Sequence, residues 1–476
     1  MTFSGALKLT DLDDFITPSQ ACVKPEVIQK NQDKKARITF HPDGEVVEEE
    51  EDGNSKVLES AKITLNDCLA CSGCVTSAET MLITAQSGAE FLSSLEKNKM
   101  EGNAKKIVVV SVSPQSRASL AAFYRMPIRQ AYAKLITCLK SMGVDYVFDT
   151  SFSRDFALRE AAAEFISRYR REYGEKDKEL PMLASACPGW ICLAEKSHGD
   201  FILPYISSTK SPQQIMGTIV KEYFAKQLDT TADRIYHVTV MPCYDKKLEA
   251  SRDDFYNDVL STRDVDCVLS SGEILDIIKG LGKPFSDYEE SAIDSLFTNI
   301  RGEELFGVAG GSGGYIEYIF KRAARELFNK EVTEIQYQPS RNNDFKTLTL
   351  EVEGKKVLEF ALAYGLRNIQ NVVRKLKQNK DQNRYHFVEI MACPSGCING
   401  GGQIRPQEGE DPKKLLKRVE LLYNETMKKD PEDNEASEKL QRLWFDGVFT
   451  LDAKTKLHTQ YHAREKMQTN ALNIKW

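Results

Sequence analysis

The chain has 476 residues, of which 41% are hydrophobic and 28% are charged. This composition is typical of a folded globular protein, and it excludes a disulfide-knot peptide and a fibrous or disordered chain. Lys and Arg number 64 against 70 Asp and Glu, so the formal net charge of -6 gives no basic field that would attract nucleic acid or an acidic membrane. We therefore expect no direct binding to either.

Two features predict a cytosolic or nuclear protein. The strongly apolar runs, such as Ile107–Val112, are too short to span a bilayer, and Asp11, Asp13 and Asp14 stand where a secretory signal would carry Lys or Arg. Eleven cysteines are many for a reducing compartment, and an odd number does not suit a closed set of disulfides. Metal ligation is therefore the first hypothesis for the cysteines.

Three regions are expected along the chain. Residues 1–100 combine a polar arm with a compact, cysteine-containing segment that we expect to be ferredoxin-like. Residues 101–430 alternate between strand-like and helix-like segments, which predicts an α/β domain with parallel sheets in two lobes. Residues 431–476 are predicted to form a helical segment and a polar tail.

The α/β region begins with the apolar run "KIVVVSVSP", and its further strands are predicted at "VDYVFDTS", "PMLASACPG", "RIYHVTVMPC", "VDCVLSSG" and "RYHFVEIMACPSG". Helices are predicted over residues 133–142, 156–173 and 214–227, with Gly143 ending the first. Between residues 333 and 360 the alternation in "TEIQYQ" and "KTLTLEVEGKKVLEF" predicts antiparallel strands, with a hairpin turn at Glu353 and Gly354.

The segment "CLACSGC" places Cys68, Cys71 and Cys74 in C-x2-C-x2-C spacing. This spacing lets successive thiolates wrap one face of a cuboidal iron-sulfur cluster, and it fits tetrahedral zinc less naturally. A ferredoxin run would supply its fourth cysteine within a few residues, but residues 75–77 contain none. Cys22 is the other cysteine that precedes the α/β region, and we assign it as the fourth ligand.

A second group of cysteines is spread across the α/β region. Cys187 in "ASACPGW", Cys243 in "MPCYDKKLE" and Cys393 in "MACPSGCINGGGQ" each follow a strand-like run, and Cys397 lies in the same segment as Cys393. Open α/β sheets bind ligands at the carboxyl ends of their strands, so the four thiolates could converge there. Nearby glycines would allow the backbone to approach closely. The alternative is that each is an ordinary buried cysteine.

Other features are predicted to be structural. Cys138, Cys192 and Cys267 fall in apolar contexts without ligand spacing, which favours core positions. The segment "GVAGGSGG" lacks the Lys-Ser or Lys-Thr that would end a P-loop, so nucleotide binding is not expected.

The segments "ACPGW", "MPCYDKKLE", "GVAGGSGG" and "MACPSGCINGGGQ", in this order, resemble the active-site signatures of the iron-only hydrogenases. The segments "TDLDDF" and "LNDCLACSGCVTSAE" resemble in particular the hydrogenase-like proteins of cytosolic iron-sulfur assembly, the group that includes the nuclear prelamin A recognition factor. The resemblance extends from about residue 6 to the end of the chain.

The resemblance implies an iron-only hydrogenase-like, two-lobed α/β fold with two 4Fe-4S clusters. The first would be held by the N-terminal cysteines, and the second would be buried between the lobes. The implied ligands are Cys22, Cys68, Cys71 and Cys74 for the first cluster, and Cys187, Cys243, Cys393 and Cys397 for the second. The implied partners are an early cluster scaffold and the cytosolic targeting complex, with its WD40 protein and associated subunits.

Departures from the hydrogenase pattern predict an assembly factor without hydrogenase activity. Ala186 stands where catalytic hydrogenases usually carry a proton-relaying cysteine, and Tyr315 and Ile316 stand next to the expected place of a diiron subsite. Lys246 and Glu249 do match the hydrogenase pattern. A catalytic hydrogenase therefore stays open as an alternative, and a zinc-stapled nuclear-envelope interaction protein is a second.

The last residue, Trp476, is a candidate partner-binding residue. A terminal aromatic side chain next to a carboxylate can fill a pocket and supply a charge at the same time. In the resembled pathway a C-terminal Trp is thought to meet the targeting complex, although Lys475 replaces the acidic residue common in that tail. A frayed chain end is the alternative.

Overall fold

The computed structural model describes residues 36–40, 46–50, 55–58, 82–100, 102, 105–174, 180–310, 312–338, 342–378 and 385–463. The N-terminal cluster ligands predicted at Cys22, Cys68, Cys71 and Cys74 lie outside these residues, and so does Trp476. Strands β1 (Ala36–Phe40), β2 (Val46–Glu50) and β3 (Ser55–Leu58) form a small antiparallel sheet.

The first lobe is built on a parallel four-stranded sheet. Its strand order is β10 (Cys267–Ser270), β7 (Ile235–Met241), β4 (Ile107–Val112) and β5 (Tyr146–Asp149). Residues 108–112 are buried, as expected for a parallel strand with both faces covered. Helices that contribute to the core of this lobe are α3 (Gly88–Met100), α4 (Pro114–Tyr124), α5 (Ile128–Met142) and α12 (Ser271–Gly280).

Local sequence sets the ends of these helices. Ser270 caps α12, since its hydroxyl accepts from the Glu273 amide while the Glu273 carboxylate accepts from the Ser270 amide. Gly143 ends α5 in the left-handed conformation, with φ of 112°, as the sequence predicts.

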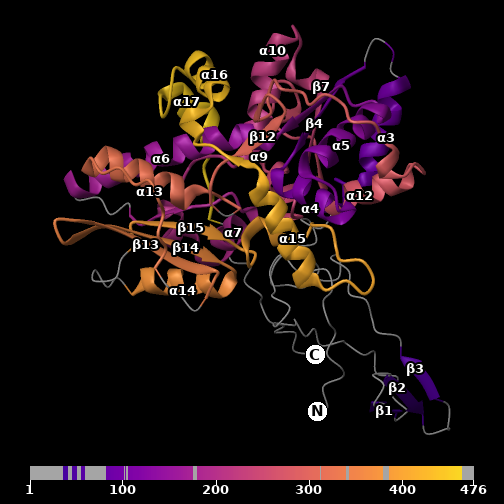
Figure 1. Cartoon of the computed structure of the whole chain (residues 1–476), viewed down its shortest axis with the longest axis horizontal. Helices are drawn as coiled ribbons and strands as arrows, with labels where there is room; N and C mark the ends of the chain where they lie inside the picture. The colour runs from indigo at the N-terminus through magenta and orange to yellow at the C-terminus, as the bar shows by residue number, and fades with distance from the viewer. Residues whose placement is uncertain are drawn as a thin grey trace, which may run out of the picture.

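The second lobe contains a sheet with the strand order β13 (Phe345–Val352), β14 (Lys355–Tyr364), β15 (Phe387–Met391) and β6 (Met182–Ala184). β13 and β14 form the predicted antiparallel hairpin, turning at Glu353 and Gly354 with φ of 52° and 74°. The other strand pairs are parallel. Figure 1 shows α13 (Tyr315–Phe328) and α14 (Leu366–Lys377) on opposite sides of this sheet.

The two lobes share apolar packing through alternate residues of β4. Val108, Val110 and Val112 face the helices of the first lobe, while Val109 packs with Phe148 into the core of the second. Side chains alternate across a strand, so one short strand contributes to both cores. The prediction of a two-lobed α/β fold with parallel sheets is confirmed.

Three sequence predictions of secondary structure need correction. Residues 333–338, "TEIQYQ", form no strand, although the Gln338 amide donates to the Thr347 carbonyl beside β13 at 2.9 Å. Helix α5 begins five residues before its predicted start, and helix α6 (Thr150–Gly174) begins six residues before its own. The Asp149 carboxylate accepts from the Ser151 amide at 2.8 Å, so this Ser-rich segment is capped as a helical turn instead of remaining a loop.

The remaining helices connect and cover the lobes. The helix predicted over residues 214–227 is present, with a π-helical stretch at Ile219–Phe224 between α9 (Pro212–Thr218) and α10 (Ala225–Gln227). Further helices are α7 (Pro188–Leu193), the π-helical stretch Ala194–His198, α8 (Gly199–Ile202), α11 (Asp245–Ala250), α15 (Pro412–Glu425), α16 (Glu435–Phe445) and α17 (Leu451–Leu457). Short 3-10 turns and two small sheets complete the described elements. In one sheet β12 (Glu304–Gly307) lies between β11 (Ile300–Arg301) and β16 (Met427–Lys428), and in the other β8 (Tyr256–Asn257) pairs with β9 (Thr262–Arg263). Among the described residues no helix combines the length and the apolar character needed to cross a membrane.

The C-terminal segment after α17 lies against the body of the molecule. The Thr459 amide donates to the Ser208 carbonyl at 2.8 Å, and the Lys210 amide donates to the Leu457 carbonyl at 2.8 Å. Further along, the His462 amide donates to the Glu195 carboxylate at 3.0 Å. Residues 457–462 are therefore attached at several points, to residues 208–210 before α9 and to Glu195 in the π-helical stretch after α7.

Candidate functional site

Three of the predicted ligand cysteines follow the carboxyl ends of strands. Cys187 follows β6 and precedes α7, Cys243 follows β7, and Cys393 follows β15. These three side chains are buried and Cys397 is partly buried. The structure thus places cysteines at strand ends of both lobes, as the sequence predicts.

The loops carrying Cys187 and Cys393 lie side by side because β6 and β15 are parallel neighbours. The Ala392 amide, one residue before Cys393, donates to the Cys187 sulfur at 3.4 Å. Burial, and then proximity to Cys397, raises the pKa of the Cys187 thiol. Cys187 is therefore close to the loop that carries the other two cysteines of the second lobe.

Glycines bring the Cys243 loop against the chain that follows Cys397. The Gly402 amide donates to the Pro242 carbonyl at 2.9 Å, and a Cβ atom at Gly402 would lie 3.1 Å from both the amide nitrogen and the Cα of Cys243. A Cβ at Gly400 would overlap the Pro242 carbonyl oxygen. The glycines after Cys397 thus permit a backbone approach that side chains would prevent.

The glycine-rich segment "GVAGGSGG" supports the Cys397 loop. The Ser312 hydroxyl accepts from the Cys397 amide at 2.8 Å, while the Ser312 carbonyl accepts from Gln115 Nε2 at 2.9 Å. A Cβ at Gly396 would overlap the Ser312 hydroxyl. This contact links α4 of the first lobe to the cysteine loop of the second.

The donor set consists of four cysteines on loops that contact one another, which is the kind of ligand that an iron-sulfur cluster takes. Within the described residues, no three His, Cys, Asp or Glu side chains lie close enough together to bind one metal ion. A cuboidal cluster instead requires separated thiolates, since each binds a different iron, together with amide donors to sulfur and restricted solvent access. The loop glycines and buried thiols meet the last requirement.

Three residues that bear on the hydrogenase alternative are Lys246, Tyr315 and Ile316, and the structure shows the contacts or burial of each. The Lys246 ammonium lies 2.7 Å from the Glu249 carboxylate and donates to the Ser211 hydroxyl at 3.0 Å. Tyr315 and Ile316 are both buried. The charge of Lys246 is therefore balanced within the chain, and large side chains fill the positions next to the expected diiron subsite.

The sequence analysis missed a buried carboxyl group near the cysteine loops. Glu389 in β15 is fully buried, and its carboxylate accepts from the Ile316 amide and from the Tyr364 hydroxyl, both at 2.8 Å. Burial raises its pKa to about 7. The signal in the sequence was an acidic residue inside the apolar strand "FVEIM".

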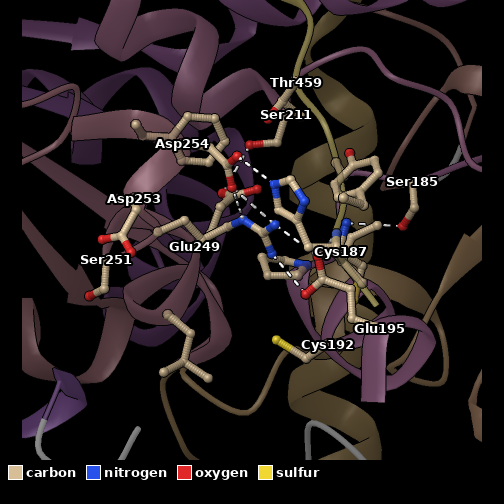
Figure 2. Close-up of a pocket in the computed structure, with 18 of the residues that line it drawn as sticks. Ser185, Cys187, Cys192, Glu195, Ser211, Glu249, Ser251, Asp253, Asp254 and Thr459 are labelled. Carbon is tan, nitrogen blue, oxygen red and sulfur yellow. Dashed lines mark hydrogen bonds and ion pairs between the residues drawn. The ribbon is translucent and has the colours of Figure 1, made fainter. Parts of the chain in front are cut away.

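A cavity of about 590 Å³ opens beside Cys187. Four acidic residues gather around it, as Figure 2 shows: Glu195, Glu249, Asp253 and Asp254. Arg252 forms ion pairs with Glu195 and Asp254 there. Cys192, predicted as a core residue, is only partly buried and lines this cavity, whereas Cys138 and Cys267 are buried as predicted.

Comparison with known families defines the class of this fold and site. Residues 106–401 match the family described as iron only hydrogenase large subunit, C-terminal domain. The chain of an apo FeFe hydrogenase, HydA1 from Chlamydomonas reinhardtii, is 27% identical, with a TM-score of 0.68 over 79% of this chain and 99% of that chain. A second solved FeFe hydrogenase is 28% identical, with a TM-score of 0.69 and the same coverage. This is an iron-only hydrogenase-like domain.

Similarity over the full length narrows the family. The chain is 55% identical to "Cytosolic Fe-S cluster assembly factor narfl" of Xenopus tropicalis and 52% identical to "Cytosolic iron-sulfur assembly component 3" of Rattus norvegicus. Each match covers 100% of this chain and 99% of the relative. The chain therefore belongs to the family of the narfl and component 3 cytosolic iron-sulfur assembly factors, which confirms the resemblance found in the sequence.

Proposed function

We propose that this protein is an iron-sulfur component of the cytosolic machinery that matures cytosolic and nuclear 4Fe-4S proteins. In this role it links an early cluster scaffold to the targeting complex, with its WD40 protein, that delivers clusters to apoproteins. The observation that carries the proposal is the meeting of the Cys187, Cys243 and Cys393–Cys397 loops at the junction of the lobes. The full-length similarity to cytosolic assembly factors supports it.

The proposed cofactors are two 4Fe-4S clusters. Cys187, Cys243, Cys393 and Cys397 would hold one, which would supply one-electron chemistry when bound. Cys187 would be one thiolate ligand of this cluster. The Ala392 amide donates to the Cys187 sulfur in the structure and would do the same with the cluster bound. The other cluster is proposed on Cys22, Cys68, Cys71 and Cys74, and it is the more accessible cluster in this proposal.

The proposed role is non-catalytic with respect to hydrogen. Ala186 provides no thiol to relay a proton, and the ammonium of Lys246 is balanced by Glu249. Tyr315 and Ile316, at the positions next to the expected diiron subsite, are both buried. If purified protein showed infrared bands from metal-bound carbonyl and cyanide, the hydrogenase alternative would replace this proposal.

The proposed partner contact uses Trp476. Its side chain would dock on the targeting complex, and the protein would act in the cytosol and in the nucleus. Removing Trp476 should then weaken binding to that complex and lower the activity of its 4Fe-4S clients, while leaving iron content unchanged. Equal binding of the truncated chain would contradict this contact.

The first experiment measures iron, sulfide and zinc after anaerobic purification, with electron paramagnetic resonance (EPR) of the reduced protein. About eight irons with two separable signals are expected for two 4Fe-4S clusters. Cys393→Ala should remove one signal and Cys71→Ala the other. Cys138→Ala changes a buried cysteine outside both sets and should keep both signals.

Two outcomes would overturn the cluster proposal. Zinc without iron would support the zinc-stapled interaction protein. An unchanged EPR spectrum in Cys393→Ala would show that the second set of cysteines does not hold a cluster. Maturation of cytosolic 4Fe-4S enzymes in cells that express each variant then tests the assembly role. Full client activity with Cys393→Ala would contradict that role for the buried site.

A further inference from the structure

Three cationic side chains line one small cavity where four elements meet. Arg117 comes from α4, Arg154 from α6 and Lys428 from β16, and Tyr423 of α15 lines the same cavity. The cavity has a volume of about 10 Å³, which leaves room for about one particle of the size of a water molecule. Its other lining residues are Pro114, Ser151, Gly307, Val308 and Thr426. None of the described residues that line it is acidic.

Arg154 is a buried cation whose hydrogen-bond partner is a neutral hydroxyl. It is 8% exposed, and its guanidinium donates to the Tyr423 hydroxyl at 2.8 Å. Within the part of the chain that the structure describes, no carboxylate lies within ion-pair distance of this guanidinium. Asp155, the next residue in the chain, accepts instead from the side-chain amides of Asn299 at 3.2 Å and Asn434 at 2.6 Å. Arg154 therefore brings a positive charge to the cavity without a carboxylate beside it.

The other two cations are incompletely paired. Arg117 is 2% exposed and forms an ion pair with Asp149, but its Nε is buried without a hydrogen-bond partner. Lys428 is exposed as a residue, but its ammonium donates to the Tyr423 carbonyl at 3.2 Å. The removal of water from this ammonium, followed by the charges of Arg154 and Arg117, lowers the pKa of Lys428 to about 8. Among the described residues, Asp149 is thus the one carboxylate in ion-pair contact with any of the three cations.

A second cavity connects this site with solvent. It has a volume of about 200 Å³, and it shares Val308 and Lys428 with the small cavity. Its charged lining is mixed, because it contains Lys321, Lys428 and Lys429 as well as Glu317 and Asp430. The excess of positive charge therefore belongs to the small inner cavity. A small ion can reach the inner cavity through the outer one, past the flexible side chain of Lys428.

We propose that the inner cavity binds one small monovalent anion, of the size and charge of chloride, between Arg117, Arg154 and Lys428. Guanidinium and ammonium groups donate hydrogen bonds but cannot accept them, so the best occupant is one that only accepts. Buried cations without a full counter-charge are costly, and a bound anion offsets this cost. A water molecule would fill the space but would bring no charge, whereas phosphate and sulfate are too large for it. No cysteine lines the cavity, so the site does not depend on the proposed clusters.

The proposed ion would join elements of the two lobes. Arg117 lies in α4, which contributes to the core of the first lobe, while Arg154 lies in α6, whose apolar residues pack in the core of the second. The unfolded chain does not bring these cations together, so anion binding favours the folded state by mass action. Stability should therefore depend on the concentration of a small anion, and not on ionic strength alone.

The first experiment is thermal unfolding of the complete protein while sodium chloride replaces sodium gluconate at constant ionic strength, so that screening of surface charges stays the same. Between 1 and 100 mM chloride the midpoint should rise by about 2 °C or more. Bromide should act like chloride, and sulfate should not. Arg154→Gln should abolish the chloride dependence, and Lys428→Gln should weaken it. Arg170→Gln removes an exposed cation from the same helix, about 24 Å further along, and should keep the wild-type dependence.

The second experiment locates the ion by anomalous scattering from crystals grown in sodium bromide. A bromide peak between Arg117 and Arg154 is expected in the wild type, with none in Arg154→Gln. A wild-type midpoint that does not depend on chloride overturns the proposal, and a bromide peak without that dependence means an adventitious ion only. Equal chloride dependence in Arg154→Gln and Arg170→Gln also overturns it. Should Arg154→Gln fail to fold, Lys428→Gln decides, and a wild-type chloride dependence in that variant overturns the proposal.

Discussion

Lys246, which is buried, and Glu249, which is partly buried, form an ion pair, with 2.7 Å between the ammonium nitrogen and a carboxylate oxygen. Ser211 joins the pair, since its hydroxyl donates to Glu249 at 3.0 Å and accepts from Lys246 at 3.0 Å. The two charges thus satisfy each other inside the molecule.

Glu249→Gln should therefore lower the free energy of unfolding by about 3 kcal/mol, because it leaves the buried Lys246 ammonium without a counter-charge. Urea denaturation measures this change. Glu334→Gln removes an exposed carboxylate and should change stability by less than about 0.5 kcal/mol. Equal effects of the two substitutions would show that the buried pair does not stabilise the fold.

Glu389 should make stability fall as pH rises. Burial raises its pKa from 4.5 to about 7, so between these values the unfolded chain releases a proton that the folded chain keeps. This group alone lowers the free energy of unfolding by up to about 1.4 kcal/mol per pH unit in that window. The loss should stop above about pH 7.

Denaturation of Glu389→Gln between pH 5 and 8 tests this. The free energy of unfolding should fall less steeply with pH in the variant than in the wild type, because a glutamine at position 389 cannot titrate. This difference in slope does not depend on the stability of the variant at any one pH. Glu351→Gln, at an exposed position of β13 in the same sheet, should keep the wild-type slope. A wild-type slope in Glu389→Gln would contradict the raised pKa.

Gly402→Ala should separate the Cys243 loop from the loop that carries Cys397. The added Cβ would lie 2.9 Å from the Ser270 Cβ and 3.1 Å from the Cys243 amide nitrogen. We expect a loss of about 1 to 3 kcal/mol of stability and a reduced iron content. Gly280→Ala, at the end of α12 with no atom within 4 Å of the new Cβ, should be neutral or slightly stabilising. Full iron content in Gly402→Ala would mean that the loops do not need this close approach.

Glu160 should hold the C-terminal segment in place. Its fully buried carboxylate accepts from the Phe449 amide, from Gln441 Nε2 and, at 3.1 Å, from His458 Nε2. Glu160→Ala leaves these donors unpaired, so we expect a loss of about 3 kcal/mol and faster hydrogen exchange in residues 449–462. Glu222→Ala removes an exposed partner of Lys456 in the same region and should have little effect. Unchanged exchange in Glu160→Ala would show that other contacts hold the segment.

The sequence predicts those parts of the site that depend on local pattern. Cys187, Cys243 and Cys393 could be placed at strand ends because apolar runs of strand length stop just before them. The alternation in "TEIQYQ" led to a wrong strand prediction. Alternating polar and apolar residues indicate alternate exposure of side chains, but they do not show whether a neighbouring strand is there to pair with. Arg154 and Tyr423 could not be paired in advance, since their contact joins α6 to α15 across the long sequence between them.

The attachment of residues 457–462 to the body of the molecule also shapes the cavity beside Cys187. Thr459, Tyr461 and His462 line the cavity that Cys187 also lines. A movement of this segment would therefore change the wall of the cavity without any change in the strand that precedes Cys187.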